Sequence, residues 1–235
     1  MPTTIDKIVD GFLFTTIPPI IGDPTYNTIA EVNLKLNSNS ASVQSNLGCD
    51  TLGLFQLTVS PAVYNTLSAI PFIVPVNPVY VPIIPANSTG AQITELRHAF
   101  DTASALFNKY DRTDKALRKI LLSTVDEMFI RSLPHKYVRY GLTTTRTILD
   151  HLYTSYANIY SADLLENDSV FCTPYDINQP IETLFDRVEN CGDYAAAGNN
   201  PNSLKQVIGI AFQLVYQTDL FVDNCKAWKT SAHST

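Results

Sequence analysis

The sequence predicts an all-α fold, a multi-helix bundle with an N-terminal arm and a proline-rich extended connector. Three observations lead to this prediction. Apolar residues recur at steps of three and four along most of the chain, which is the spacing of one helix face. Residues that begin and end helices stand at the limits of these stripes. Strand-like alternation does not persist anywhere, and no repeat of fixed period is present.

The strongest helical pattern lies between residues 112 and 159, and it predicts two amphipathic helices. Pro134 ends the first apolar stripe, and Gly141 supplies a flexible turn. Thr143 is then placed to cap the second helix with its hydroxyl group. The first stripe consists of Ala116, Leu117, Ile120, Leu121, Val125, Met128 and Phe129, and the second of Ile148, Leu149, Leu152, Tyr153 and Tyr156.

The first 89 residues are predicted to form an arm, short helices and the connector. Residues 1–22 show no clear period and are assigned to the arm. The Asp23-Pro24 pair begins a helix that Gly48 ends, although the middle of that helix is rich in asparagine and serine. The Ser60-Pro61 pair repeats the same start signal for a short helix that runs through Leu67.

Residues 71–86 form the longest apolar stretch, and five prolines cross it. Proline lacks an amide donor and clashes inside a helix, so this stretch is predicted to be extended and polyproline-like. The same prolines exclude a membrane-spanning helix. We expect valines and isoleucines to lay this connector against the core as a packed linker. A strip that binds a partner is the alternative.

Residues 90–235 are predicted to form a second, helical region with a lobe boundary near residue 160. The Ser88-Thr89 pair begins its first helix, which residues 111–114 interrupt or restart. Ser161, Pro180 and Ser203 each precede a further apolar stripe, and Gly198 stands where a helix C-cap is expected. A last helix is predicted over residues 220–228.

The core is predicted to need neither disulfides nor metal ions, because 235 residues can bury a sizeable apolar interior. The four cysteines lie far apart and form no C-x-x-C pair, so neither a zinc site nor a disulfide framework is expected. A reducing compartment fits this pattern. The predicted core residues are Leu121, Met128, Leu149, Leu152, Phe185, Val188, Val207 and Leu214.

Charge is distributed unevenly along the chain. The net charge of -6 argues against a generally basic nucleic-acid coat. Between Lys109 and Arg146, however, nine bases stand against four acids, whereas eleven acids face four bases from Thr147 onward. This asymmetry can orient copies of the chain head to tail or create a weak phosphate-facing surface; the alternative is that the basic segment is a solvated helix face. The candidate nucleic-acid contacts are Lys115, Arg118, Lys119, Lys136 and Arg139.

No catalytic, cofactor-binding or metal-binding residue is predicted. The nine glycines form no phosphate-binding loop, and the four histidines show no metalloprotease spacing. A nucleophile elbow is absent, and the acidic pairs along the chain do not distinguish a general acid from a general base. We therefore expect a protein that is not an enzyme and needs no cofactor.

Four segments share the order of motifs of a known family. The first reads D-x-A-L-x-x-I-L-L-S from Asp114, and T-R-T-I-L-D-H-L-Y-x-x-Y follows it from Thr145. Residues 178–186, NQPIETLFD, and residues 193–198, DYAAAG, continue the pattern. Together they resemble the Gag-like capsid segment of copia-type LTR retrotransposon polyproteins. The resemblance covers residues 114–228, about half of the chain.

This resemblance implies a structural protein that associates with copies of itself and packages element RNA in particles. We therefore expect the chain to bind copies of itself and, weakly, RNA. We expect neither a cofactor nor a membrane partner. The N-terminal residues lack the pattern of a signal peptide, and a cytoplasmic location is expected. The alternative is a helical RNA-binding or adaptor module that does not assemble.

Overall fold

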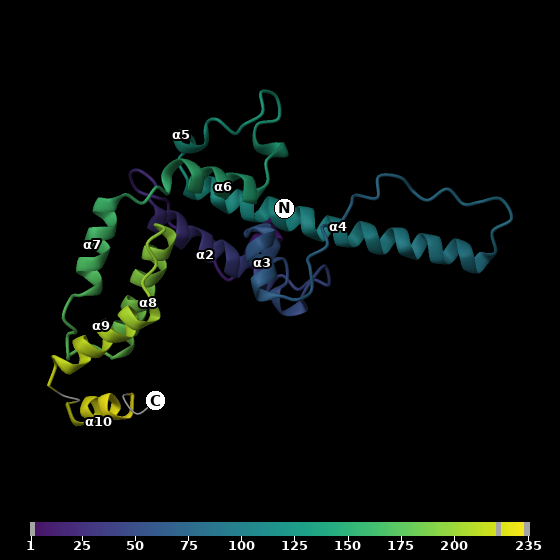
Figure 1. Cartoon of the computed structure of the whole chain (residues 1–235). Helices are drawn as coiled ribbons and strands as arrows, with labels where there is room; N and C mark the ends of the chain where they lie inside the picture. Colours follow the sequence, from purple (N-terminus) through teal and green to yellow (C-terminus); the bar gives the residue numbers. More distant parts are fainter. Residues whose placement is uncertain (1–2, 220–221, 233–235) are drawn as a thin grey trace. The chain divides into compact units, whose positions relative to one another are not determined.

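The computed structural model of the chain is built from helices, which confirms the predicted all-α class (Figure 1). It describes residues 3–219 and 222–232, and neither range contains a β-strand. The chain divides into two compact units, residues 1–157 and residues 158–235. None of the helices in these described ranges combines the length and the apolar character that crossing a membrane requires.

The elements of the first unit are six α-helices and three short 3-10 turns. The helices are α1 (Thr4–Asp10), α2 (Tyr26–Ser42), α3 (Pro61–Leu67), α4 (Gly90–Thr124), α5 (Glu127–Ile130) and α6 (Thr145–Tyr156). The turns are η1 (Asp50–Leu52), η2 (Phe55–Leu57) and η3 (Tyr140–Leu142). The predicted helix after the Ser60-Pro61 pair is therefore present with its expected limits.

Helix α4 is the element on which the first unit is built. A capping box of Thr89 and Gln92 begins it, and it continues for 35 residues. The predicted interruption at residues 111–114 is wrong. Asp111 and Asp114 each pair with the base four residues later, so both acids support the helix that they were expected to break.

The C-terminal half of α4 forms the core together with α1, α2 and α6. The predicted core residues Leu121, Leu149 and Leu152 are fully buried there. Met128 was also expected in this core, and that prediction is wrong, because its side chain is 58% exposed. Helix α4 ends at Thr124, and Asp126 caps a new helix, so the apolar stripe does not continue in phase to residue 128.

The N-terminal arm is docked on this core and contains a helix, α1, that the sequence did not reveal. Phe12 and Ile17 are buried, and the amide of Ile20 donates to the carbonyl oxygen of Thr124 at 2.9 Å. The division predicted after residue 89 thus falls inside the first unit, because the arm and α2 pack on α4. The lobe boundary expected near residue 160 lies close to the division at residues 157/158.

Polar residues in the last turn of α2 hold the arm in place. The side-chain amide of Asn39 donates to the carbonyl oxygen of Phe14 and accepts from its amide, both at 2.8 Å. Ser40 lies 3.1 Å from the hydroxyl of Thr58. Both α2 residues are fully buried, and both are hydrogen-bonded, as buried polar groups must be. The residues that weaken the helix locally are therefore used for tertiary contacts.

The connector is extended, as predicted, but its valines and isoleucines do not pack against the core. Only Phe72 packs against it, with its ring near those of Tyr64 and Tyr110 at 5.7 and 6.2 Å. Most of the other large side chains point to solvent. Figure 1 shows the connector leaving the body near α3 and returning to the start of α4, whose first half extends beyond the other helices of the unit. The packed-linker prediction is wrong.

The second unit contains α7 (Ser161–Phe171), α8 (Glu182–Ala197), α9 (Leu204–Tyr216) and α10 (Val222–Ala232). Ser203 caps α9 and Gly198 ends α8, both as predicted. Helix α7 is capped by Tyr160 instead of Ser161. Leu220, where the last helix was expected to begin, lies outside the described residues.

The core of the second unit is small. Val188 and Leu214 are buried in it as predicted, and Val207 is partly buried against it. Phe185 was expected to be core, but it is 55% exposed, so that prediction is wrong. Helix α8 turns Leu184 inward, at spacings of four and seven from its other buried positions, which leaves the next residue outside.

Candidate functional site

Four of the five candidate nucleic-acid contacts form ion pairs with acidic side chains of the same chain. Lys115 lies 2.6 Å from Asp111, and Lys119 lies 2.6 Å from Asp6 on α1. Arg139 pairs with Glu127. The fifth, Lys136, lies over the ring of Tyr137 with its ammonium group 5.3 Å from the ring centre.

Arg118 lies inside the unit, and only 12% of its side chain is exposed. Its guanidinium group lies 3.5 Å from the carboxylate of Asp114 and donates to the carbonyl oxygen of Thr143. A phosphate cannot reach this group without opening the structure. The structure therefore brings the candidates together only in part: Lys115 and Lys119 share α4 with Arg118, whereas Lys136 and Arg139 lie in the loop before η3.

The acidic partners limit the attraction of this surface for phosphate. The pair of Lys119 and Asp6 is the clearest example, because hydrogen bonds from Lys119 and Thr3 lower the pKa of Asp6 to about 2. The carboxylate is therefore ionised near neutral pH, and the pair has no net charge. Exposed pairs of this kind are screened by salt. RNA binding through these bases is expected to be weak.

Asp114 is the residue that joins α4 to α6. Its carboxylate accepts from the amide of Thr145 at 3.0 Å, and the hydroxyl of Thr145 donates to the backbone carbonyl of Asp114 at 3.0 Å. Burial raises the pKa of Asp114, while the bonds from Thr145 and the charge of Arg118 act in the opposite direction. Thr144, one residue after the predicted cap, caps α6.

The contact between Asp114 and Thr145 explains part of the sequence pattern. These are the first residues of the two longest motifs on which the family resemblance is based. Both are buried, and they are hydrogen-bonded to each other at two points. The motifs therefore describe one helix junction. Sequence reasoning found both stripes and missed the junction, because a polar pair 31 residues apart has no local signature.

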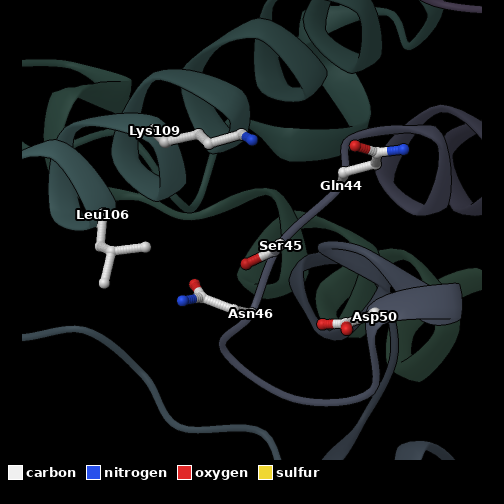
Figure 2. A pocket seen from close by; sticks show the side chains of 6 residues that line it. All are labelled: Gln44, Ser45, Asn46, Asp50, Leu106 and Lys109. Atoms are coloured by element: carbon white, nitrogen blue, oxygen red, sulfur yellow. The ribbon is translucent and has the colours of Figure 1, made fainter.

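One surface depression, of about 460 Å³, lies beside the middle of α4. Figure 2 shows Leu106 and Lys109 on the helix facing the loop that carries Ser45 and Asn46. Gln44 and Asp50 complete the lining. This set has one carboxylate, one ammonium group, two amides and a hydroxyl, without a histidine or a second acid.

A second depression, of about 340 Å³, lies between α5 and α6, and we call it the aromatic pocket. The rings of Phe129 and Tyr156 form one wall, edge to face at 5.3 Å, and the His151 ring lies 6.2 Å from that of Tyr156. A ring nitrogen of His151 lies 3.0 Å from the carbonyl oxygen of Phe129. Met128, Arg131 and Ser132 complete the lining. Sequence reasoning missed this pocket because it took Met128 for a core residue.

Metal binding finds no support in the part of the chain that the structure describes. Residues 3–219 and 222–232 contain no group of three or more histidine, cysteine or acidic side chains that could hold an ion. Cys49, Cys172, Cys191 and Cys225 are all free thiols.

Comparison with known proteins gives no match: no family model, no curated protein and no solved structure is significantly similar to this chain.

Proposed function

We propose that the chain is a Gag-like capsid protein of a copia-type retrotransposon, which associates with copies of itself into particles that package element RNA. The observation that carries the proposal is that the all-helical chain divides into two units, each with its own core. The point of division lies within the region that resembles this family. A helix junction in the first unit and two motif segments in the second account for the resembling residues.

The exposed surface also supports self-association. A monomeric soluble protein rarely exposes contiguous apolar patches larger than a few hundred Å². This chain exposes many large apolar side chains, in the connector, around the aromatic pocket and on α8 and α9. A particle in which each subunit touches several neighbours needs several such surfaces, each of modest size. Buried and hydrogen-bonded polar residues, by contrast, serve the fold itself.

Self-association is expected to grow stronger with salt. The second unit carries ten acids and four bases, so the whole net charge of -6 lies there, and two such units repel each other at low ionic strength. Sedimentation velocity at rising protein concentration, in low and in physiological salt, measures this. A chain that stays monomeric in both buffers, with and without added RNA, would refute the proposal.

RNA binding is expected to be weak and to disappear when Lys119, Lys136 and Arg139 are replaced by glutamate. These three side chains are exposed, so the reversal changes local charge by six units without touching the core. Because fewer bases then face phosphate groups, the salt dependence of any remaining binding should also decrease. Fluorescence anisotropy with a labelled single-stranded RNA in low salt tests this expectation.

Lys7, Lys35 and Lys205 provide the matched control for that experiment. Replacing these three residues by glutamate makes the same change of charge outside the candidate surface. RNA affinity that falls equally in both variants would mean that only total charge matters. Arg118 is left unchanged, because its replacement would disturb the helix junction.

The alternative function is an adaptor or RNA-binding module that does not assemble. The exposed connector favours it, because polyproline-like segments are common ligands of other proteins. The sedimentation experiment separates the two functions, since an adaptor stays monomeric.

A further inference from the structure

The connector and Ile70 just before it carry a run of exposed apolar side chains, which we call the exposed strip. No acidic or basic residue occurs between Thr51 and Thr94, so nothing along this part of the chain opposes burial of the strip against another apolar surface. Its large side chains have exposed fractions between 40% and 92%. They are Ile70, Ile73, Val74, Val76, Val79, Tyr80, Val81, Ile83 and Ile84.

The backbone at the start of the exposed strip is hydrogen-bonded at Ile70 and Ile73, whereas the strip's carbonyl groups after Ile73 have no partners among the described residues. Within the described ranges, none of the carbonyl groups of residues 74–84 accepts a hydrogen bond. Three of these residues are prolines, which have no amide hydrogen to donate. The strip is therefore rich in acceptors and poor in donors. Segments of this type dock in grooves lined by aromatic side chains, where their extended backbone is already ordered before binding.

The aromatic pocket has the complementary chemistry. Phe129, Tyr156 and His151 provide ring surfaces, and the flexible side chain of Met128 is more than half exposed at the rim. Arg131 has no ion-pair or hydrogen-bond partner in the described part of the chain, so its guanidinium group is available to donate to carbonyl oxygens. No acidic side chain lines the pocket.

The aromatic pocket lies at the C-terminal end of α4. Helix α6 starts beside Asp114, and its last turns reach α5, since the ring of His151 lies against the carbonyl oxygen of Phe129. Helix α5 follows α4 after two residues. The exposed strip, in contrast, leads into the N-terminal end of α4 at Gly90.

Chain length prevents the second half of the exposed strip, from Val79 onward, from reaching the aromatic pocket of its own molecule. The 35 residues of α4 span about 52 Å at 1.5 Å per residue. The eleven residue-to-residue steps from Val79 to Gly90 span at most about 40 Å when fully extended. Val79 and every strip residue after it therefore stay short of the pocket as long as α4 is intact, and only a second molecule can bring them there.

We propose that the exposed strip of one copy of the chain docks in the aromatic pocket of a second copy. This inference rests on the proposed self-association and names its contact. The two surfaces are different, so the contact is heterologous: each bound copy still offers a free strip and a free pocket to the next one. Growth is therefore open-ended unless the geometry closes a ring.

A peptide with the sequence of residues 71–86, made soluble by added lysines and carrying a fluorophore, tests the pocket directly. It should bind the full chain saturably, and Met128→Glu should weaken binding by at least about tenfold. Leu142→Glu is the matched control, because Leu142 is an exposed apolar residue outside the pocket, and it should bind the peptide as the parent does. Circular dichroism checks that both variants are folded.

Mixing two variants tests whether the contact is heterologous. The strip variant carries Val76→Glu, Val79→Glu and Ile83→Glu, and the pocket variant carries Met128→Glu. Each alone should sediment as a monomer. A mixture should give a one-to-one complex that grows no further, because one intact strip and one intact pocket remain. A control with Leu13→Glu, Ile21→Glu and Leu34→Glu changes three similarly exposed residues elsewhere and should assemble as the parent does.

The outcomes distinguish this inference from the proposed function. Assembly of the parent without peptide binding, or peptide binding that Met128→Glu leaves unchanged, would overturn the inference and leave the capsid proposal standing. If the parent chain binds the peptide but stays monomeric, the proposed self-association is refuted, and so is the proposal that a second copy of the chain occupies the pocket. Strip and pocket variants that each assemble alone would show that the copies meet through other surfaces.

Discussion

Replacing Leu152 with alanine should lower the free energy of unfolding of the first unit by about 2–5 kcal/mol, the range for removing a buried leucine and leaving a cavity. Leu152 is 1% exposed and lies in the centre of the contact of α6 with α2 and α4. Since the chain has two units, hydrogen exchange of the α6 amides during a denaturant titration follows the relevant transition.

Met128→Ala is the control for this measurement. Both residues were predicted to be core, and both substitutions remove a large apolar side chain from the same unit. Met128 is mostly exposed, so its loss should change the free energy of unfolding by no more than about 0.5 kcal/mol. Equal effects of the two substitutions would mean that α6 does not pack as described.

The second large effect is expected at the helix junction, where Asp114→Ala should cost about 3 kcal/mol. The substitution removes the partner of a guanidinium group that is almost fully buried, and it leaves the amide of Thr145 without its acceptor. The effect lies at the lower end of the range for breaking a buried pair, because the carbonyl oxygen of Thr143 still accepts from Arg118. Urea denaturation followed by hydrogen exchange measures it.

Asp111→Ala supplies the comparison for the junction, since it removes an acid of the same type one turn earlier on α4. Its pair with Lys115 is partly exposed, and such pairs contribute about 0.3–0.5 kcal/mol on a helix. If Asp114→Ala proved equally mild, the buried contacts with Thr145 would not hold α6 in place.

Some helix limits were predictable from a local signal, but others were not: the helix expected from Pro24 to Gly48 runs from Tyr26 to Ser42, and the caps expected at Thr143 and Ser161 lie one residue away. Ser60 before Pro61, Ser203 before an apolar stripe and Gly198 after one are all used as the sequence suggests. Burial was less predictable, because it depends on the phase of the stripe. The break at residues 125 and 126 turned Met128 outward, and the choice of Leu184 as the inner residue left Phe185 exposed.

The arm and the candidate site depended on contacts between distant residues. Helix α1 has only seven residues, too few to be stable without the surface of α4 on which it packs. The charge of Lys119 looked available in the sequence, whereas its partner Asp6 lies 113 residues away. A pattern of bases along one segment gives no information about acids that folding brings to it.

The docking of the arm on α4 also sets the order in which the protein can fold during its synthesis. The hydroxyl of Thr124 donates to the carbonyl oxygen of Ile17. Thr124 leaves the ribosome 107 residues after Ile17. At cellular elongation rates this delay is on the order of ten seconds. During that time the first half of the chain, including its long uncharged stretch, has no core to pack on. Chaperones that hold apolar segments have their longest access to the protein then, and release becomes favourable once α6 has emerged.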